Sequence, residues 1–161
     1  MALPLDLSVV VPIYNEQDSL PELVNQLLKA LLPSGHTFEI VLVNDGSHDN
    51  SAQVLREISA ETPQLVCVML RKNYGQTAAM AAGFDVARGE IIVSLDGDLQ
   101  NDSADIPQLI DKLHEGYDLV SGWRVDRQDA VLQRKLPSKL ANRLIGFVTG
   151  VRLHDYGCSL K

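Results

Sequence analysis

Short apolar runs alternate with helix-forming segments along most of this chain. The predicted strands are residues 7–12, 38–43, 65–70, 90–95 and 117–121, and the predicted helices are residues 17–32, 50–60, 75–87 and 104–115. Apolar runs without polar interruption are typical of strands that are buried on both faces. Strands of this kind separated by helices indicate βαβ units. The sequence therefore predicts an α/β fold, a mainly parallel sheet with helices on both faces.

Composition limits the broad class of the protein. The chain has 161 residues, of which 45% are hydrophobic and 22% charged, as in an ordinary globular domain. Cys67 and Cys158 are too few for a disulfide framework. No apolar stretch approaches the roughly 20 residues of a membrane span, and the N-terminus lacks the basic start of a signal peptide. We expect a soluble domain and no nucleic-acid partner.

Charge is distributed unevenly between two parts of the chain. Residues 123–161 hold eight of the 14 lysines and arginines but only three of the 21 acidic residues. Within this part, leucine or valine recurs every fourth position from 132 to 148, with basic side chains mostly between them. The pattern fits a basic segment that meets an anionic partner, or a core helix with a solvated face. We predict an α/β core at 1–122 and a basic segment of the same domain at 123–161.

Polar clusters follow the first four predicted strands. They read YNE at 14–16, NDGS at 44–47, RKN at 71–73 and DGD at 96–98. Because ligands bind beyond the carboxyl ends of parallel strands, these clusters predict one site at that edge of the sheet.

Asp96 and Asp98 predict a metal site. Two carboxylates two residues apart on an extended segment lie on the same side, and Gly97 lets the backbone approach a ligand. Mg²⁺ or Mn²⁺ prefers one or two carboxylates together with phosphate oxygens. A metal-free turn is the alternative. Asp45 predicts a contact to a base or ribose, with a turn and helix cap as the alternative.

Taken together, the motifs VPIYNE, VNDGSHDNS, RKNYGQTAAMAAGFDVARGE and SLDGDLQND resemble family 2 glycosyltransferases. DLQND, SGWRVDR and HDYGCSLK make the chain similar to the polyprenyl-phosphate group, which includes dolichol-phosphate mannosyltransferases and bactoprenol glucosyltransferases. The resemblance covers essentially the whole chain. It implies the GT-A fold, with a Rossmann-like sheet. It also implies a core at 1–122 that binds the nucleotide sugar and, in the same domain, a segment at 123–161 on the acceptor side.

The resemblance also implies roles for individual residues. The nucleotide-sugar pocket would be formed by Pro12, Tyr14, Glu16, Asn44, Asp45, Asp96 and Gln100. Asp98, with Asp96, would hold the metal that bridges the diphosphate, while Arg124 and Arg127 would grip the acceptor phosphate. Asp155 would position the acceptor or act as a base. Asn44 departs from the Asp-Asp pair frequent in the family, which leaves one carboxylate at that place.

The implied reaction is metal-dependent, inverting transfer of a hexose from a nucleotide sugar to a polyprenyl phosphate. We expect UDP-glucose rather than GDP-mannose, and a location at the cytoplasmic face of a membrane. The resemblance also implies that this chain is a catalytic part that precedes C-terminal transmembrane helices. We also consider self-association of the chain. Two alternatives stay open, a glycosyltransferase that uses a glycan hydroxyl and a module that binds nucleotide sugars without transfer.

Overall fold

The computed structural model of the chain describes residues 5–122 and 159–161. Its strands are β1 (Leu5–Ile13), β2 (Phe38–Asn44), β3 (Leu65–Met69) and β4 (Gly89–Ser94). Its helices are α1 (Leu20–Leu31), α2 (Ser51–Glu61), α3 (Gln76–Val86) and α4 (Ile106–Leu113), with short 3-10 helices η1 (Leu32–Ser34) and η2 (Ser103–Asp105). Arg124, Arg127 and Asp155 lie outside the described residues, as does most of the predicted basic segment.

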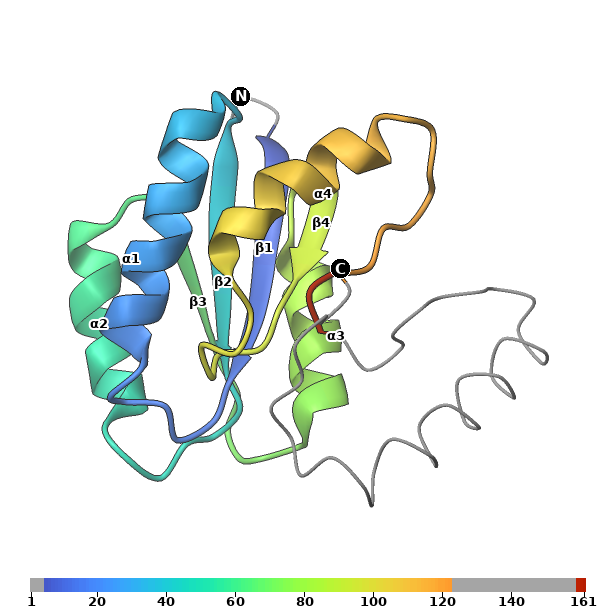
Figure 1. The fold of residues 1–161 in the computed structure, drawn as a ribbon. Helices are drawn as coiled ribbons and strands as arrows, with labels where there is room; N and C mark the ends of the chain where they lie inside the picture. The colour runs from blue at the N-terminus through green and yellow to red at the C-terminus, as the bar shows by residue number, and fades with distance from the viewer. Residues whose placement is uncertain (1–4, 123–158) are drawn as a thin grey trace, which may run out of the picture.

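All four strands run parallel in the order β3-β2-β1-β4 (Figure 1). Val9 of β1 lies opposite Ile40 of β2 on one side and opposite Val93 of β4 on the other. After β1 the chain therefore adds β2 and β3 on one side of β1, and later adds β4 on the other side of β1. This reversal of strand order makes the carboxyl end of β1 the switch point where ligands bind in such sheets.

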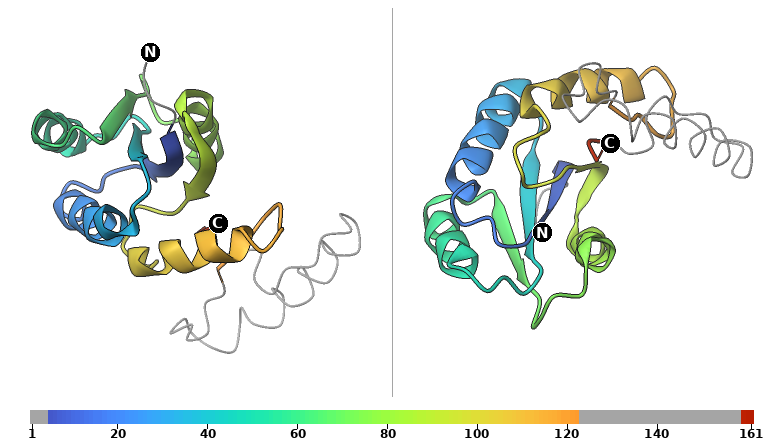
Figure 2. Two further views of the ribbon diagram at one scale, coloured as in Figure 1. Left: turned by 90° about the horizontal axis from the view of Figure 1, so that it is seen from above. Right: turned by 60° about the horizontal axis from the view of Figure 1, so that its bottom comes forward.

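Side chains of successive strand residues point to opposite faces of the sheet, and helices cover both faces (Figure 2). On one face, Val9 and Val11 of β1 belong to a core cluster with residues of α1, α2 and α4. On the other face, Val10 packs with Ala79 of α3. The predicted α/β architecture is confirmed, since an apolar run without alternation is what two covered faces require.

The predicted fifth strand at residues 117–121 is wrong. In the described part of the chain, the sheet has four strands and residues 117–121 belong to none of them. The open edge of β4 is instead met by the last residue, because Ser94 N donates to Lys161 O at 2.8 Å and Lys161 N donates to Ser94 O at 3.1 Å. A run of apolar residues predicts burial, but not which segment receives the hydrogen bonds of an edge strand.

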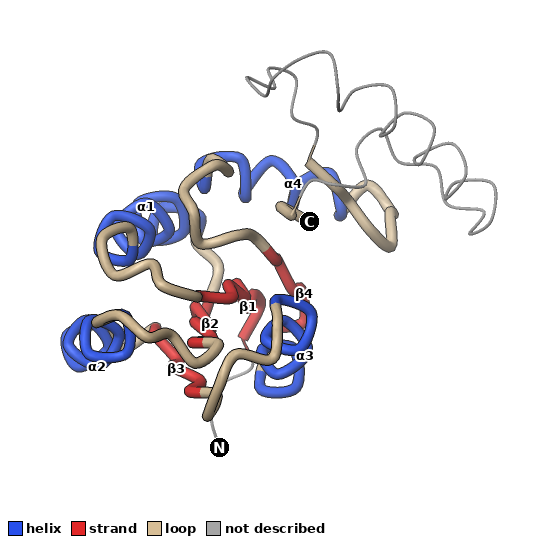
Figure 3. The backbone as a smooth tube through the Cα atoms, turned by 90° about the horizontal axis from the view of Figure 1, so that it is seen from below, coloured by secondary structure: helices blue, strands red, loops and turns tan. Residues whose placement is uncertain are grey.

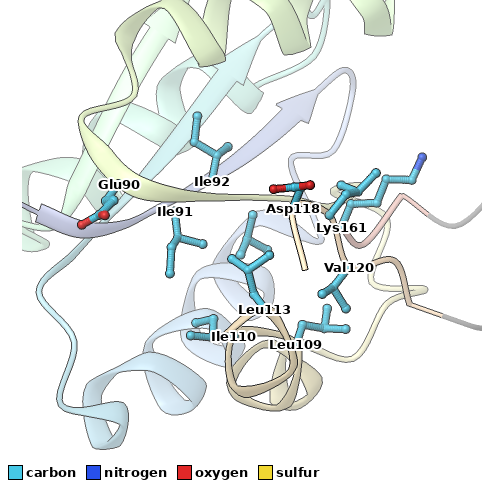
Figure 4. A pocket seen from close by; sticks show the side chains of 11 residues that line it. Glu90, Ile91, Ile92, Leu109, Ile110, Leu113, Asp118, Val120 and Lys161 are labelled. Carbon is cyan, nitrogen blue, oxygen red and sulfur yellow. The ribbon is translucent and has the colours of Figure 1, made fainter. Parts of the chain in front are cut away.

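An apolar cavity of about 330 Å³ lies between β4 and α4. Figure 4 shows Ile91 of β4 facing Ile110 and Leu113 of α4, with Val120 beside them. Leu119 also lines this cavity and is half exposed. Leu119 and Val120 thus contribute side chains to this cavity rather than a strand to the sheet.

Candidate functional site

A pocket of about 340 Å³ lies at the carboxyl ends of the strands, the edge that faces the viewer in Figure 3. Its lining residues are Pro12, Ile13, Tyr14, Glu16, Asp45, Asn73, Gln76, Asp96, Gly97 and Asp98. They lie at the end of β1 and in the segments that follow β1, β2, β3 and β4, so parts of the chain that are far apart in the sequence meet around the end of β1. The structure thus brings at least one residue of each strand-end cluster to this pocket.

The loop after β1 is held by the loop after β2. Asn15 N donates to Ser47 Oγ at 3.0 Å, and Glu16 N donates to Ser51 Oγ at 2.9 Å. Gln17 N donates to Asp49 Oδ2 at 3.1 Å. Helix α1 begins at Leu20 and not at residue 17 as predicted. Amides that bond to a neighbouring loop satisfy their hydrogen bonds without joining the helix. The DGSHDNS segment therefore fixes the course of YNE.

Asp49 accepts from Gln17 N in the loop after β1 and from Ser51 N at the start of α2. Burial raises its pKa, but hydrogen bonds from the side chain and amide of Ser51 and from the amide of Gln17 outweigh burial, and the pKa lies below its ordinary value. The carboxylate form is the better acceptor for these donors. Asp49 thus connects the two loops as a charged carboxylate.

Tyr14 and Glu16 present different groups to the pocket. Tyr14 is 41% exposed, and its ring meets the His48 ring edge-on, with centroids 6.2 Å apart. Glu16 Oε2 accepts from Ser19 Oγ at 2.5 Å, which ties its carboxylate to the residue before α1. The open aromatic face offers a stacking surface for a flat ligand.

The two polar residues at the end of β2 have different surroundings. Asn44 is buried and outside the pocket lining, with Oδ1 accepting from Ser47 N at 3.0 Å. Its Nδ2 donates to Met69 Sδ at 3.6 Å. Asp45 lines the pocket, and its two oxygens accept from Tyr74 N at 2.8 Å and Gly75 N at 2.9 Å. Direct contact of Asn44 or Asp45 with a base remains a prediction.

The loop after β4 brings two carboxylates to the pocket. Asp96 is half-buried, and its Oδ1 accepts from Gln76 Nε2 at 2.5 Å. Asp98 is exposed, and its Oδ1 accepts from the backbone amide of Gln100 at 3.1 Å. Gln100 itself is exposed and lies outside the pocket lining. Gly97 lies between the two carboxylates, and a Cβ there would come within 2.8 Å of Ile13 Cδ1.

The donor set at Asp96 and Asp98 fits a hard divalent cation. Among residues 5–122 and 159–161, no group of three His, Cys, Asp or Glu side chains is arranged to hold a metal. Mg²⁺ and Mn²⁺ do not need such a cage, because one or two carboxylates complete their shell with water and ligand phosphates. The two carboxylates therefore fit a divalent cation whose remaining ligands are water and ligand oxygens.

Two polar side chains of the pocket lining, those of Asn73 and Gln76, were not among the predicted site residues. Asn73 follows β3 within the RKN cluster, and Gln76 is the first residue of α3. Asn73 carried a signal, since it stands at a strand end like the others. Gln76 lies in the RKNYGQTAAMAAGFDVARGE motif but follows no strand directly, and only the packing of the loop before α3 brings it to Asp96.

The sequence also matches known proteins. Residues 8–160 match the family described as Glycosyl transferase family 2. A dodecaprenyl-phosphate galacturonate synthase of Rhizobium johnstonii is 50% identical over 98% of this chain and 47% of its own length. An undecaprenyl-phosphate 4-deoxy-4-formamido-L-arabinose transferase of Pseudomonas aeruginosa is 48% identical over 98% of this chain and 47% of its own length. The chain thus spans about half the length of these relatives.

Solved structures share the fold. A mannosyltransferase from Pyrobaculum calidifontis, in complex with GDP-Man and Mn²⁺, superposes with a TM-score of 0.62 at 24% identity, over 74% of this chain and 35% of its own. Staphylococcus aureus TarS 1-349, in complex with UDP-GlcNAc, superposes with a TM-score of 0.55 at 30% identity, over 68% of this chain and 33% of its own. The fold is thus GT-A, as the motifs predicted. Given the match over nearly its whole length, the chain belongs to glycosyl transferase family 2.

Proposed function

We propose that this chain transfers a sugar from a nucleotide sugar to a polyprenyl phosphate, with inversion at the anomeric carbon. One observation carries the proposal, which is that the carboxylates of Asp45, Asp96 and Asp98 line a single pocket at the switch point of the sheet. The names of two relatives, both about half identical to the chain, support a polyprenyl-phosphate acceptor.

Asp96 and Asp98 are the residues that would hold Mg²⁺ or Mn²⁺ here. A bound divalent cation neutralises the charge that develops on a departing diphosphate. Asp96 has one oxygen engaged by Gln76 and a second oxygen for a ligand. Asp98 is exposed beside it and is oriented by the amide of Gln100. Tyr14 would stack on the base, and Glu16 and Pro12 would complete the wall around the nucleotide.

The acceptor needs little activation. A phosphate monoester has a second pKa of about 6 and is largely a dianion at pH 7, so its oxygen is already a nucleophile. The protein must instead hold two anionic groups close together. We assign this task to Arg124 and Arg127, whose guanidinium groups can bind phosphate through two hydrogen bonds. Asp155 would position the acceptor. These three residues are assigned from sequence resemblance.

For the donor, we propose a UDP-linked sugar. TarS, which is 30% identical, was solved with UDP-GlcNAc, and this supports uridine. The expected glucose has no counterpart in the names of the two relatives, which specify galacturonate and 4-deoxy-4-formamido-L-arabinose. We therefore propose a modified sugar of this kind in place of glucose.

We place the reaction at the cytoplasmic face of a membrane, where a polyprenyl phosphate would present its headgroup. The basic residues between 123 and 161 would be attracted to anionic lipids. In the part of the chain that the structure describes, no helix has the length and hydropathy needed to cross a bilayer.

Two assays test the proposal. Calorimetric titration of the chain with UDP and GDP, each with and without Mn²⁺, should give metal-dependent binding of UDP. Transfer is then assayed with UDP-galacturonate, a UDP-linked formamido-arabinose and UDP-glucose, offered with undecaprenyl phosphate in vesicles or with a glycan. Transfer to the glycan alone would contradict the acceptor. Metal-dependent binding without transfer to either acceptor would identify a binding module.

A further inference from the structure

One chain of contacts runs from the end of β2 to the end of β4 across the pocket. Asp45 follows β2 and Asp96 follows β4, and β1 lies between these two strands. The loop at residues 70–75 and the first residue of α3 join the two carboxylates. Asp45 binds the backbone of Tyr74 and Gly75, and the next residue, Gln76, donates to Asp96.

Asp45 fixes where α3 begins. Each of its oxygens accepts one backbone amide, and such bonds to a carboxylate are stronger than those to neutral acceptors. Gly75 precedes the helix with φ of 93°. The loop also lies tightly on the end of β2, since a Cβ on Gly46 would come within 2.3 Å of the Lys72 carbonyl carbon. The start of α3 therefore has little freedom to move relative to β2.

Gln76 uses this fixed start to orient Asp96. Its Nε2 donates to Asp96 Oδ1 at 2.5 Å, although the two residues are 20 positions apart in the sequence. A primary amide is a neutral donor, so the carboxylate keeps its full negative charge while its rotation is restricted. A lysine or arginine in this place would neutralise the charge that a cation needs.

From this geometry we infer that Gln76 is a positioning residue for Asp96, and that Asp45 acts on the same carboxylate through the start of α3. The inference rests on the proposed function in that Asp96 is taken as a metal ligand. Groups that orient a metal ligand typically change metal affinity by about 10- to 100-fold when they are removed. Asp45 thus serves the metal side of the pocket in addition to any contact with the nucleotide.

The first test needs no ligand. In NMR spectra of the ¹⁵N-labelled chain, the side-chain amide of Gln76 should shift when Asp96 is changed to Asn, whereas the amide of Gln53 should not. Gln53 is the matched control, since it is exposed on α2 and its Nε2 donates to Glu57 Oε1 at 2.9 Å. In Asp45→Asn, the amides of Tyr74 and Gly75 should exchange faster with solvent. Unchanged Gln76 and loop signals would overturn the inference.

The second test measures UDP binding with and without Mn²⁺ in Gln76→Ala and in Gln53→Ala. We expect Gln76→Ala to weaken UDP binding in the presence of Mn²⁺ about 10-fold. UDP binding without metal and the melting temperature should stay unchanged in this variant. The control Gln53→Ala should keep wild-type UDP affinity with and without Mn²⁺. The positioning role would be overturned if Gln76→Ala lost the same UDP affinity with and without Mn²⁺, or lost none. If the wild-type chain itself binds no nucleotide, the proposed function fails, while the NMR test still decides the contact between Gln76 and Asp96.

Discussion

Arg88 Nε lies 2.9 Å from Glu39 Oε2 and binds a carboxylate that is almost completely buried. Glu39 stands in β2, and its Oε1 also accepts from Ser8 Oγ of β1 at 2.7 Å. Ser8 Oγ in turn accepts from Gly89 N at 2.8 Å, where β4 begins. One acidic side chain thus connects the amino-terminal halves of three neighbouring strands, at the opposite edge of the sheet from the pocket.

Arg88→Ala should destabilise the fold without changing the pocket. Breaking a buried ion pair costs about 3–5 kcal/mol, but the Arg88 side chain is 59% exposed, and the remaining bonds to Glu39 offset part of the loss. We expect a decrease of about 2 kcal/mol in the free energy of unfolding, measured by urea denaturation. Arg56→Ala, at an exposed position of α2, is the control and should change little.

The same network predicts a dependence of stability on acid. Burial alone would raise the pKa of Glu39, but bonds from Arg88 and Ser8 outweigh it, so that the pKa lies below its ordinary value of 4.5. Because the folded state binds the proton less readily than the unfolded chain, the stabilisation is complete above this value and declines as the pH falls through the folded pKa. Urea midpoints between pH 7 and pH 3 should fall less steeply in Glu39→Gln than in the wild type; parallel curves would contradict this origin.

Gly46→Ala should be more damaging than Gly35→Ala. Both glycines have positive φ, 63° and 78°, which costs an alanine about 1–2 kcal/mol. Only at Gly46 would the new Cβ meet backbone, 2.3 Å from the Lys72 carbonyl carbon, whereas at Gly35 no atom lies within 4 Å. We expect a further loss of about 1–3 kcal/mol at Gly46. Equal urea midpoints for the two variants would show that the loop at residues 70–75 shifts to accommodate the new Cβ at little cost in stability.

Asp98→Asn should remove the metal dependence of nucleotide binding. The substitution keeps the size of the side chain but replaces a charged oxygen ligand with a neutral one. The loss of UDP affinity in the presence of Mn²⁺ should exceed ~10-fold, the smaller effect typical of residues that only orient a metal ligand. Asp111→Asn, at an exposed position of α4, is the matched control. Calorimetry with UDP and Mn²⁺ measures the effect. Metal dependence of wild-type size in Asp98→Asn would refute the assignment of Asp98 as a ligand.

Arg124→Ala should separate binding from transfer. If the guanidinium binds the acceptor phosphate, UDP affinity stays at the wild-type value, while transfer to undecaprenyl phosphate falls by roughly 10²–10³-fold, as when one charge-stabilising donor is removed from an active site. Arg56→Ala serves again as the control for loss of a positive charge. A matching loss of UDP affinity in Arg124→Ala would assign the residue to the donor side.

Strand-end residues could be predicted as a site because a parallel sheet brings them to one edge. Tyr14, Asp45, Asp96 and Asp98 line one pocket for this reason. Asn44 shows the limit of the argument, since it also stands at a strand end but turns its amide to Ser47 and Met69. Whether a strand-end side chain faces the ligand depends on its alternation along the strand and on its loop neighbours.

The sequence by itself determined the class of fold, the parallel course of the strands and the family, because apolar periodicity and motif order are local properties of the chain. Only the tertiary structure decided which amides brace which loops, that Lys161 rather than residues 117–121 meets the edge of β4, and that Gln76 reaches Asp96. These are contacts between distant segments. Each depends on how loops of particular length pack on the end of the sheet, and no periodicity in the sequence encodes such a contact.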